Sequence, residues 1–149
     1  MERLVYQELI KWKADSHRKP LILNGARQVG KTYILREFAS KEYDRVAYFS
    51  LDREDGVRDL FARVTKPNDL IMSLSAICGI DILSGSTIVV LDEIQECPQA
   101  LTALKYFYED MPELNIAVAG SLLGLSLHGG ASFPVGKVDM LYLYPMNFE

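Results

Sequence analysis

The chain has 149 residues, of which 49% are hydrophobic and 24% are charged, and a formal net charge of −4; this is the size and balance of one globular domain with its own core. The composition excludes a collagen-like or disordered chain, and no apolar run approaches the length of a membrane helix. Because two cysteines are too few for a disulfide framework or a four-ligand zinc site, we expect reduced thiols in a cytoplasmic protein without membrane contact.

The first predicted element is a helix over residues 3–14. Its apolar residues are expected to fall on one face at a spacing of three to four residues, and they are Leu4, Val5, Leu9 and Trp12. Basic residues gather at its end and just after it, namely Lys11, Lys13, Arg18 and Lys19. They are compatible with a surface for a polyanion such as nucleic acid. We favour a solvated helix end instead, because nothing in the sequence reads bases and a DNA-binding domain is normally more basic.

Strands and helices are then predicted to alternate. Five apolar runs are typical of buried strands, at residues 21–24, 45–51, 87–91, 115–119 and 139–144. Helical patterns occupy residues 31–40, about 70–79, 98–111 and, more briefly, 121–127. The charged segment 52–66 has no clear preference. This alternation predicts an α/β fold, in which a mostly parallel five-stranded sheet carries helices on both faces.

Residues 25–32 carry the most specific pattern in the chain, G-x-x-x-x-G-K-[ST]. A predicted buried strand precedes it and a predicted helix follows, which is the context of a phosphate-binding loop (P-loop). In such a loop, backbone N–H groups surround the phosphates, Lys31 reaches the β- and γ-phosphates, and the Thr32 hydroxyl binds Mg²⁺. Arg27 contacts phosphate or forms an outward ion pair, which we favour. The expected nucleotide-binding residues are Gly25, Ala26, Arg27, Gln28, Val29, Gly30, Lys31, Thr32 and Tyr33.

Two adjacent acids, Asp92 and Glu93, end the third predicted strand. Ligands of open parallel sheets bind beyond the carboxyl ends of the strands, so these acids and the P-loop belong to one edge. We expect Asp92 to bind Mg²⁺ together with Thr32, and Glu93 to act as the general base for water attack on the γ-phosphate. Gln95 and Glu96 are alternatives for positioning this water. A solvent-exposed turn is the alternative for the acidic pair.

Ser121 follows the fourth predicted strand at the same edge. It either contacts the γ-phosphate or attacking water, or caps the short helix after it, and the two roles are compatible. No arginine occurs after Arg63, so the C-terminal half offers no arginine finger. Lys137 is a weaker candidate for a cation at the transition state. The expected catalytic residues are Lys31, Glu93 and Ser121.

Four segments resemble one known family in order and spacing. They read LILNGARQVGKT, VVLDEIQECPQALTALKYFYE, AVAGSLLGLSLH and SFPVGKVDMLYLYPMNFE. They are similar to bacterial and archaeal AAA+-like ATPases, whose P-loop domain precedes a C-terminal domain of uncharacterised function. The resemblance spans residues 1–149 and implies that residues 25–32 form the Walker A loop, that Asp92 and Glu93 form the Walker B pair, and that Ser121 is the sensor. It also implies a lid and a C-terminal domain after residue 149.

The resulting hypothesis is Mg²⁺-dependent ATP binding and hydrolysis that drives a conformational change, with a protein partner or further copies of the chain. A nucleotide-binding switch with little turnover is the alternative. A small P-loop kinase is disfavoured, because such enzymes close an arginine-bearing lid over the phosphates and none follows Arg63. ATP is favoured over GTP, because the chain lacks the late N/T-K-x-D pattern of Ras-type guanine readers.

Overall fold

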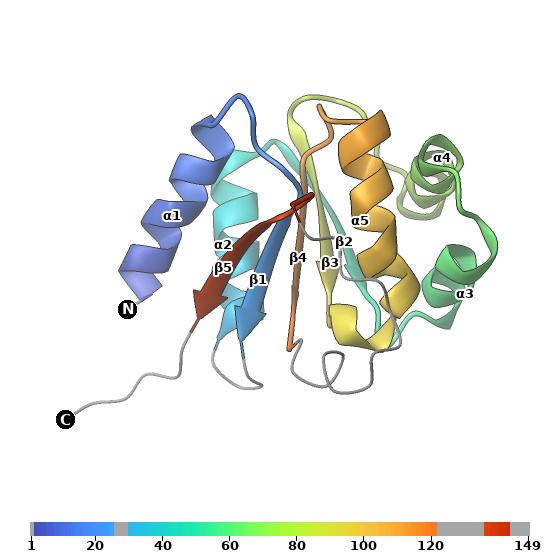
Figure 1. Cartoon of the computed structure of the whole chain (residues 1–149), viewed down its shortest axis with the longest axis horizontal. Helices are drawn as coiled ribbons and strands as arrows, with labels where there is room; N and C mark the ends of the chain where they lie inside the picture. Colours follow the sequence, from blue (N-terminus) through green and yellow to red (C-terminus); the bar gives the residue numbers. More distant parts are fainter. Residues whose placement is uncertain (1, 26–29, 122–135, 144–149) are drawn as a thin grey trace.

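A computed structural model describes residues 2–25, 30–121 and 136–143, and in it one five-stranded sheet lies between two layers of helices (Figure 1). The strands are β1 (Leu21–Gly25), β2 (Arg45–Ser50), β3 (Thr87–Asp92), β4 (Ile116–Gly120) and β5 (Asp139–Leu143). The helices are α1 (Glu2–Ala14), α2 (Lys31–Glu42), α3 (Asp55–Arg63), α4 (Pro67–Cys78) and α5 (Pro98–Asp110), with a 3₁₀ turn η1 (Ile94–Glu96). Neighbouring strands are parallel throughout, in the order β2-β3-β4-β1-β5. The predicted α/β class is confirmed.

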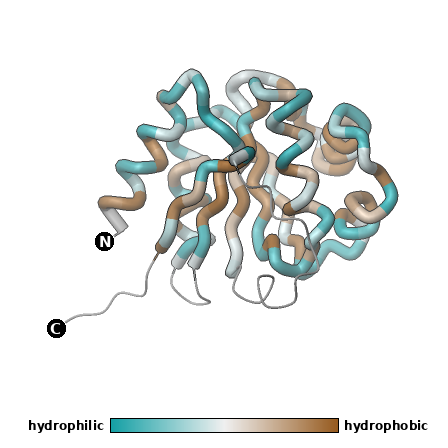
Figure 2. The backbone as a smooth tube through the Cα atoms, in the orientation of Figure 1, coloured by the Kyte–Doolittle hydropathy of each residue, from teal (hydrophilic) through white to brown (hydrophobic). Residues whose placement is uncertain are grey.

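Side chains of the buried strands point alternately to the two faces of the sheet and pack into two separate hydrophobic cores. In β3, Ile88 and Val90 pack with α1 and α2, whereas Val89 and Leu91 pack with α3, α4 and α5. This is the two-residue period of a strand that is covered on both faces. In Figure 2, hydrophobic colour runs along the central strands and hydrophilic colour gathers on the outer turns of the helices. The same alternation directs Asp92, two residues after Val90, to the α2 face.

The core beneath α1 and α2 is aromatic. Phe38 is fully buried and meets Trp12 and Tyr43 in edge-to-face contacts, with ring centroids 6.4 and 5.9 Å apart. Val5, Leu9 and Trp12 of α1 are buried, but Leu4 is 64% exposed. Its expected place on the buried face was wrong, because Leu4 lies about 100° of helix rotation away from Val5.

Helix α3 lies in the charged segment that had no clear preference in the sequence. Val57, Leu60 and Phe61 form its buried stripe at helical spacing. Helix α4 starts with Pro67 in its first turn and ends at Gly79, whose φ of 73° is left-handed and favours glycine. The helix expected at residues 121–127 lies outside the described residues, except for Ser121. Within the described part of the chain, no helix is long and apolar enough to cross a membrane.

Candidate nucleotide-binding site

Helix α2 begins where the phosphate-loop pattern ends. Gly30 precedes it with φ 82° and ψ 15°, a left-handed conformation that a residue with a Cβ adopts only at a cost. The sequence pattern therefore has a glycine where the backbone requires one. Lys31 and Thr32 open the helix, as expected, and the Lys31 side chain is only 4% exposed. Residues 26–29, including Ala26, Arg27, Gln28 and Val29, lie outside the described residues.

The end of β3 meets the start of α2 through one hydroxyl and one carboxylate. The Thr32 hydroxyl lies 3.0 Å from both Asp92 oxygens, and Asp92 is 4% exposed. These residues are 60 positions apart, and β4 separates β1 from β3 in the sheet. They meet because α2 contacts β1, β2, β3 and β4 on the face of the sheet toward which Asp92 points. The expected proximity of these two residues is thus present.

A tyrosine that the sequence did not indicate completes the surroundings of Asp92. The Tyr48 hydroxyl donates to Asp92 Oδ2 at 2.7 Å from the adjacent strand β2. Burial, followed by the hydrogen bond and the negative charge of Asp92, raises the pKa of Tyr48 to about 12. The guanidinium of Arg36 stacks over the Tyr48 ring at 4.1 Å. Arg36 is four residues after Thr32, which is one helical turn. This spacing places Arg36 on the same side of the helix as Thr32, so the sequence could have indicated Arg36 as a site residue.

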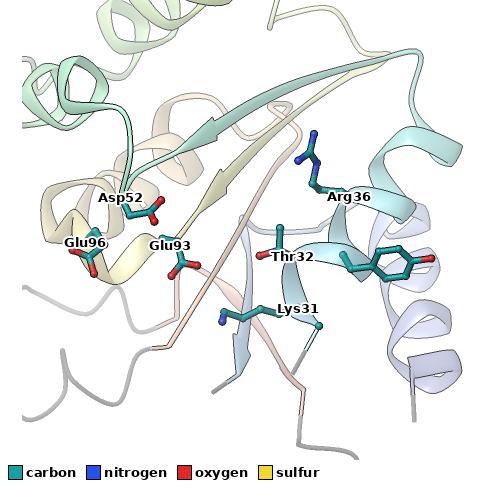
Figure 3. A pocket seen from close by; sticks show the side chains of 8 residues that line it. Lys31, Thr32, Arg36, Asp52, Glu93 and Glu96 are labelled. Atoms are coloured by element: carbon teal, nitrogen blue, oxygen red, sulfur yellow. The ribbon is translucent and has the colours of Figure 1, made fainter. Parts of the chain in front are cut away.

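An open cavity of about 650 Å³ lies beside these groups (Figure 3). One side carries Lys31, Thr32 and Arg36 from α2, and the other carries Asp52, Glu93 and Glu96. Gly30 and Tyr33 complete the lining, and Tyr33 is 66% exposed. Cations from a helix N-terminus that face carboxylates suit a ligand with phosphate groups and a bound divalent cation.

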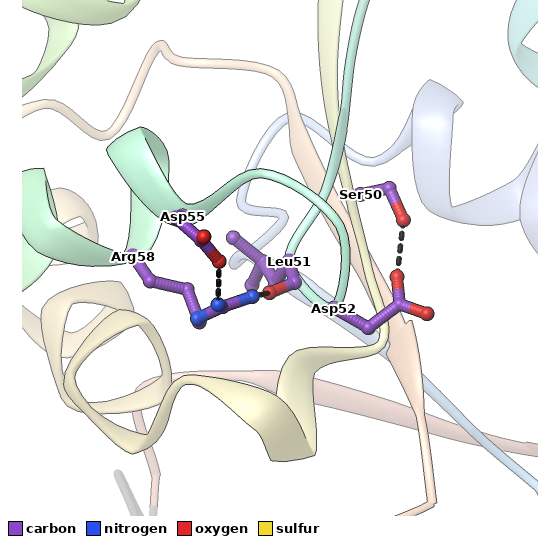
Figure 4. A network of polar contacts seen from close by, with 5 residues as sticks. All are labelled: Ser50, Leu51, Asp52, Asp55 and Arg58. Carbon is purple, nitrogen blue, oxygen red and sulfur yellow. Dashed lines mark hydrogen bonds and ion pairs between the residues drawn. The ribbon is translucent and has the colours of Figure 1, made fainter.

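The loop after β2 places Asp52 at this cavity through a small polar network (Figure 4). The Ser50 hydroxyl donates to the Asp52 carboxylate, and Arg58 of α3 donates to the Leu51 carbonyl and to Asp55. The Leu51 amide donates to the Asp92 carbonyl at 2.9 Å, which extends the β2–β3 pairing beyond the strands. Helix α3 thus anchors one wall of the cavity, a role that the sequence did not predict.

Glu93 and Ser121 are joined through Gln95. Gln95 donates to Glu93 Oε1 at 2.7 Å and accepts from the Ser121 amide at 3.1 Å. Ser121 therefore stands at the expected edge, immediately after β4. Lys137 does not: it pairs with Glu109 at 3.2 Å near the C-terminal end of α5. This is the opposite edge of the sheet, so Lys137 of the same chain is not at the site.

The basic residues around the end of α1 have partners within the chain. Lys11 pairs with Glu8 at 3.5 Å and Lys13 with Glu42 at 3.8 Å. Arg18 donates to the side-chain oxygen of Asn115, and Lys19 lies 5.9 Å from the centre of the Tyr108 ring. These contacts agree with a paired and solvated helix end.

Together, this sheet order and an α2 N-terminus beside the acid-bearing end of β3 define a P-loop domain of the nucleotide-binding class. The sequence matches the model of the family described as "AAA domain" over residues 17–149. The chain therefore belongs to this family and is an AAA+-like P-loop ATPase domain, as the resemblance implied. A search of curated proteins finds no match.

Among solved structures, the chain is similar to the Orc1 protein of Aeropyrum pernix, whose structure was determined in complex with DNA. The TM-score is 0.55 at 16% sequence identity, which is a likeness of fold. The alignment covers 99% of this chain and 44% of that chain, so the chain spans less than half the length of this structural neighbour.

Proposed function

We propose that this domain binds ATP with Mg²⁺ and hydrolyses it, and that turnover drives a conformational change in the domain or a partner. The observation that carries this proposal is the pair of 3.0 Å contacts between the Thr32 hydroxyl and the Asp92 carboxylate. A P-loop threonine and an acid at the end of a neighbouring strand are the protein groups that hold Mg²⁺ in P-loop nucleotide hydrolases. Thr32 lines the cavity beside Lys31, and Asp92 accepts from Thr32 and directly precedes Glu93, which also lines it.

Residues 25–32 and Tyr33 are proposed to hold the nucleotide. The N–H groups at the start of α2 and the helix dipole favour the negative charge of phosphate. Lys31 is buried beside the cavity, where its charge acts at a lower effective dielectric than in water. Tyr33 lines the cavity and, at 66% exposed, is proposed to contact the nucleoside.

The donor set fits Mg²⁺ rather than a fully protein-caged metal. Among residues 2–25, 30–121 and 136–143, no group of three His, Cys, Asp or Glu side chains is arranged to hold a metal. Mg²⁺ prefers oxygen ligands and usually takes one or two from protein, with the rest from phosphate and water. Thr32 and Asp92 supply those oxygens, and the ion when bound neutralises charge on the phosphates.

Glu93 is proposed as the general base. Its carboxylate lines the cavity next to Asp92, but the single Thr32 hydroxyl donor, 3.0 Å from both Asp92 oxygens, is directed to Asp92 alone. Glu93 therefore remains available to accept a proton from the attacking water. Glu96 lines the same cavity and is the alternative base, and Ser121 is proposed to sense the γ-phosphate from the end of β4.

We propose that this domain is the nucleotide-binding part of a larger protein, in which a lid and a C-terminal domain follow it. Because no arginine occurs between Arg63 and Glu149 and Lys137 lies at the far edge, the second half of this domain does not supply the cation for the transition state, which is proposed to come from the domain that follows, from a protein partner or from another copy of the chain. Such a residue is worth 10³–10⁵ in turnover in other P-loop enzymes. The Orc1 protein was solved in complex with DNA, but we do not propose DNA as a ligand of this domain.

ATP turnover of the wild type, Glu93→Gln and Glu96→Gln tests this function. Loss of a general base lowers turnover by about 10²–10⁴-fold, so Glu93→Gln is expected to bind ATP and turn over at least 100-fold more slowly. Glu113→Gln, on an exposed residue before β4, is the matched control. If Glu96→Gln lowered ATP turnover more than Glu93→Gln, Glu96 would be assigned as the general base in place of Glu93. If the wild type bound ATP tightly but did not hydrolyse it, a nucleotide-binding switch would be favoured. Transfer of phosphate from ATP to a small acceptor would favour a kinase.

A further inference from the structure

One glutamine side chain connects the proposed base to the end of β4. The Gln95 amide nitrogen donates to Glu93 Oε1 at 2.7 Å, and its oxygen accepts from the Ser121 backbone amide at 3.1 Å. Both ends of the carboxamide are therefore engaged with the correct polarity. The two partners belong to different strands, since Glu93 follows β3 and Ser121 follows β4.

The backbone around Glu93 is held in one defined turn. Glu93 has φ 58° and ψ 52° and is the only residue other than glycine with positive φ in the described part of the chain. Its amide donates to Asp92 Oδ1 at 2.9 Å, and its carbonyl accepts from the Glu96 amide at 3.0 Å. A left-handed residue that is not glycine carries strain and persists where its surroundings enforce it. This turn brings the side chains of Glu93 and Gln95 to the same place.

Gly120 provides the space that Gln95 needs. A Cβ at Gly120 would lie 2.5 Å from Gln95 Oε1 and 2.7 Å from a side-chain carbon of Ile94. Both distances are shorter than real side chains tolerate. Glycine at the last position of β4 therefore allows the carboxamide to cross the strand end and reach Ser121. The backbone of β4 and the side chain of Gln95 fit each other.

The bridge requires an amide of this length. Glutamate at this position would offer no donor to Glu93 and would place two carboxylates together. Methionine has a similar length and no donor. Because an ionised carboxylate has several acceptor positions, one bond from Gln95 orients Glu93 and leaves capacity for a water.

We propose that Gln95 is a positioning residue, which holds the Glu93 carboxylate in place and ties that place to the end of β4. This inference rests on the proposed role of Glu93 in hydrolysis. A displacement of Ser121 would then move Gln95 and release or reorient Glu93, so that events at the end of β4 regulate water activation. Gln95 itself does not touch the reacting atoms.

Steady-state ATP hydrolysis by Gln95→Met and Gln95→Glu tests the positioning role. Because a general base acts only from a productive geometry, we expect kcat to fall about 10–100-fold in both variants. The KM for ATP should change less than about threefold, since P-loop binding is not disturbed. Gln99→Met is the matched control, because Gln99 is exposed four residues later and does not line the cavity. A kcat of either Gln95 variant within twofold of the wild type would overturn the proposal.

A double-mutant cycle shows whether Gln95 acts through Glu93. If it does, Gln95→Met should lower kcat little further once Glu93→Gln is present. An equal fold-loss in both backgrounds would overturn the proposal, because Gln95 would then act independently.

A measurement without turnover separates this inference from the proposed function. In ¹H–¹⁵N NMR spectra, Glu93→Ala should shift both the Gln95 side-chain amide and the Ser121 backbone amide, because the bridge connects them. Unchanged Gln95 and Ser121 signals would reject the bridge, even if the wild type hydrolyses ATP. Shifted signals in a protein without turnover would support the bridge and reject the proposed hydrolysis.

Discussion

Tyr48 and Tyr43 are two tyrosines whose hydroxyl groups should have opposite effects on stability. Tyr48 donates to the buried carboxylate of Asp92 at 2.7 Å. The buried Tyr43 hydroxyl has no hydrogen-bond partner among the residues that the structure describes. A hydrogen bond to a charged group contributes about 1.5–3 kcal/mol, and partial exposure places Tyr48 at or below the low end. Tyr48→Phe should therefore lower the free energy of unfolding by about 1–1.5 kcal/mol.

Tyr43→Phe is the matched control, because it removes the same atom from a tyrosine that packs in the same core. Deleting an unpaired buried hydroxyl removes its desolvation penalty, so this variant should be as stable as the wild type or up to about 1 kcal/mol more stable. Urea unfolding at pH 7, followed by far-UV circular dichroism, gives both free energies. For a domain of this size, the loss in Tyr48→Phe corresponds to about 3–5 °C in Tm.

The same pair gives a prediction at alkaline pH. The pKa of each tyrosine is raised to about 12, by burial first in both cases. The folded state therefore favours the neutral phenol, and this stability is fully present below pH 10 and is lost as pH rises through 12. Two pKa units set an upper limit of about 2.7 kcal/mol, and solvent screening reduces the share of the partly exposed Tyr48 to about 1 kcal/mol. Each Phe variant should therefore lose part of the decrease in the free energy of unfolding between pH 10 and 12.

If Tyr48→Phe proved at least as stable as Tyr43→Phe at pH 7, the assigned hydrogen bond to Asp92 would be wrong.

Two further predictions concern the site and the fold. Thr32→Ala removes one proposed Mg²⁺ ligand, and should raise the Mg²⁺ concentration needed for half-maximal ATP binding at least about tenfold, as fluorescent-nucleotide titrations would show; an unchanged Mg²⁺ requirement would contradict this role. Gly79→Ala should lower the free energy of unfolding by about 1 kcal/mol, because Gly79 ends α4 at φ 73°. Gly56→Ala within α3 meets no atom within 4 Å and should raise stability by about 0.5–1 kcal/mol in the same urea assay; equal effects of the two changes would contradict the backbone argument.

The strands were predictable because buried parallel strands are continuous apolar runs, and each expected strand lies within one residue of the observed one at either end. Strand order was not predictable, because an apolar run does not specify its neighbours. Helix α3 was missed although Val57, Leu60 and Phe61 carry a helical stripe, because charged residues surround it.

Within the site, the P-loop pattern and the acids after β3 could be placed on one edge from chain order alone. The sequence could not reveal that Tyr48 faces Asp92, since this depends on the β2–β3 register, in which Ser50 pairs with Asp92. It also did not show that Gln95 reaches the end of β4. That contact depends on the absence of a side chain at Gly120, in a strand whose position in the sheet was unknown.

Calorimetric titration of the folded protein with ATP in the presence of Mg²⁺ tests the central claim most directly. The wild type should release or absorb heat on association, and Lys31→Ala should weaken binding at least about tenfold, since a charge-assisted contact to phosphate contributes about 1.5–3 kcal/mol. Lys41→Ala, an exposed lysine at the other end of α2, should bind like the wild type. Absence of binding by the wild type, or equal affinity of Lys31→Ala and the wild type, would contradict the account.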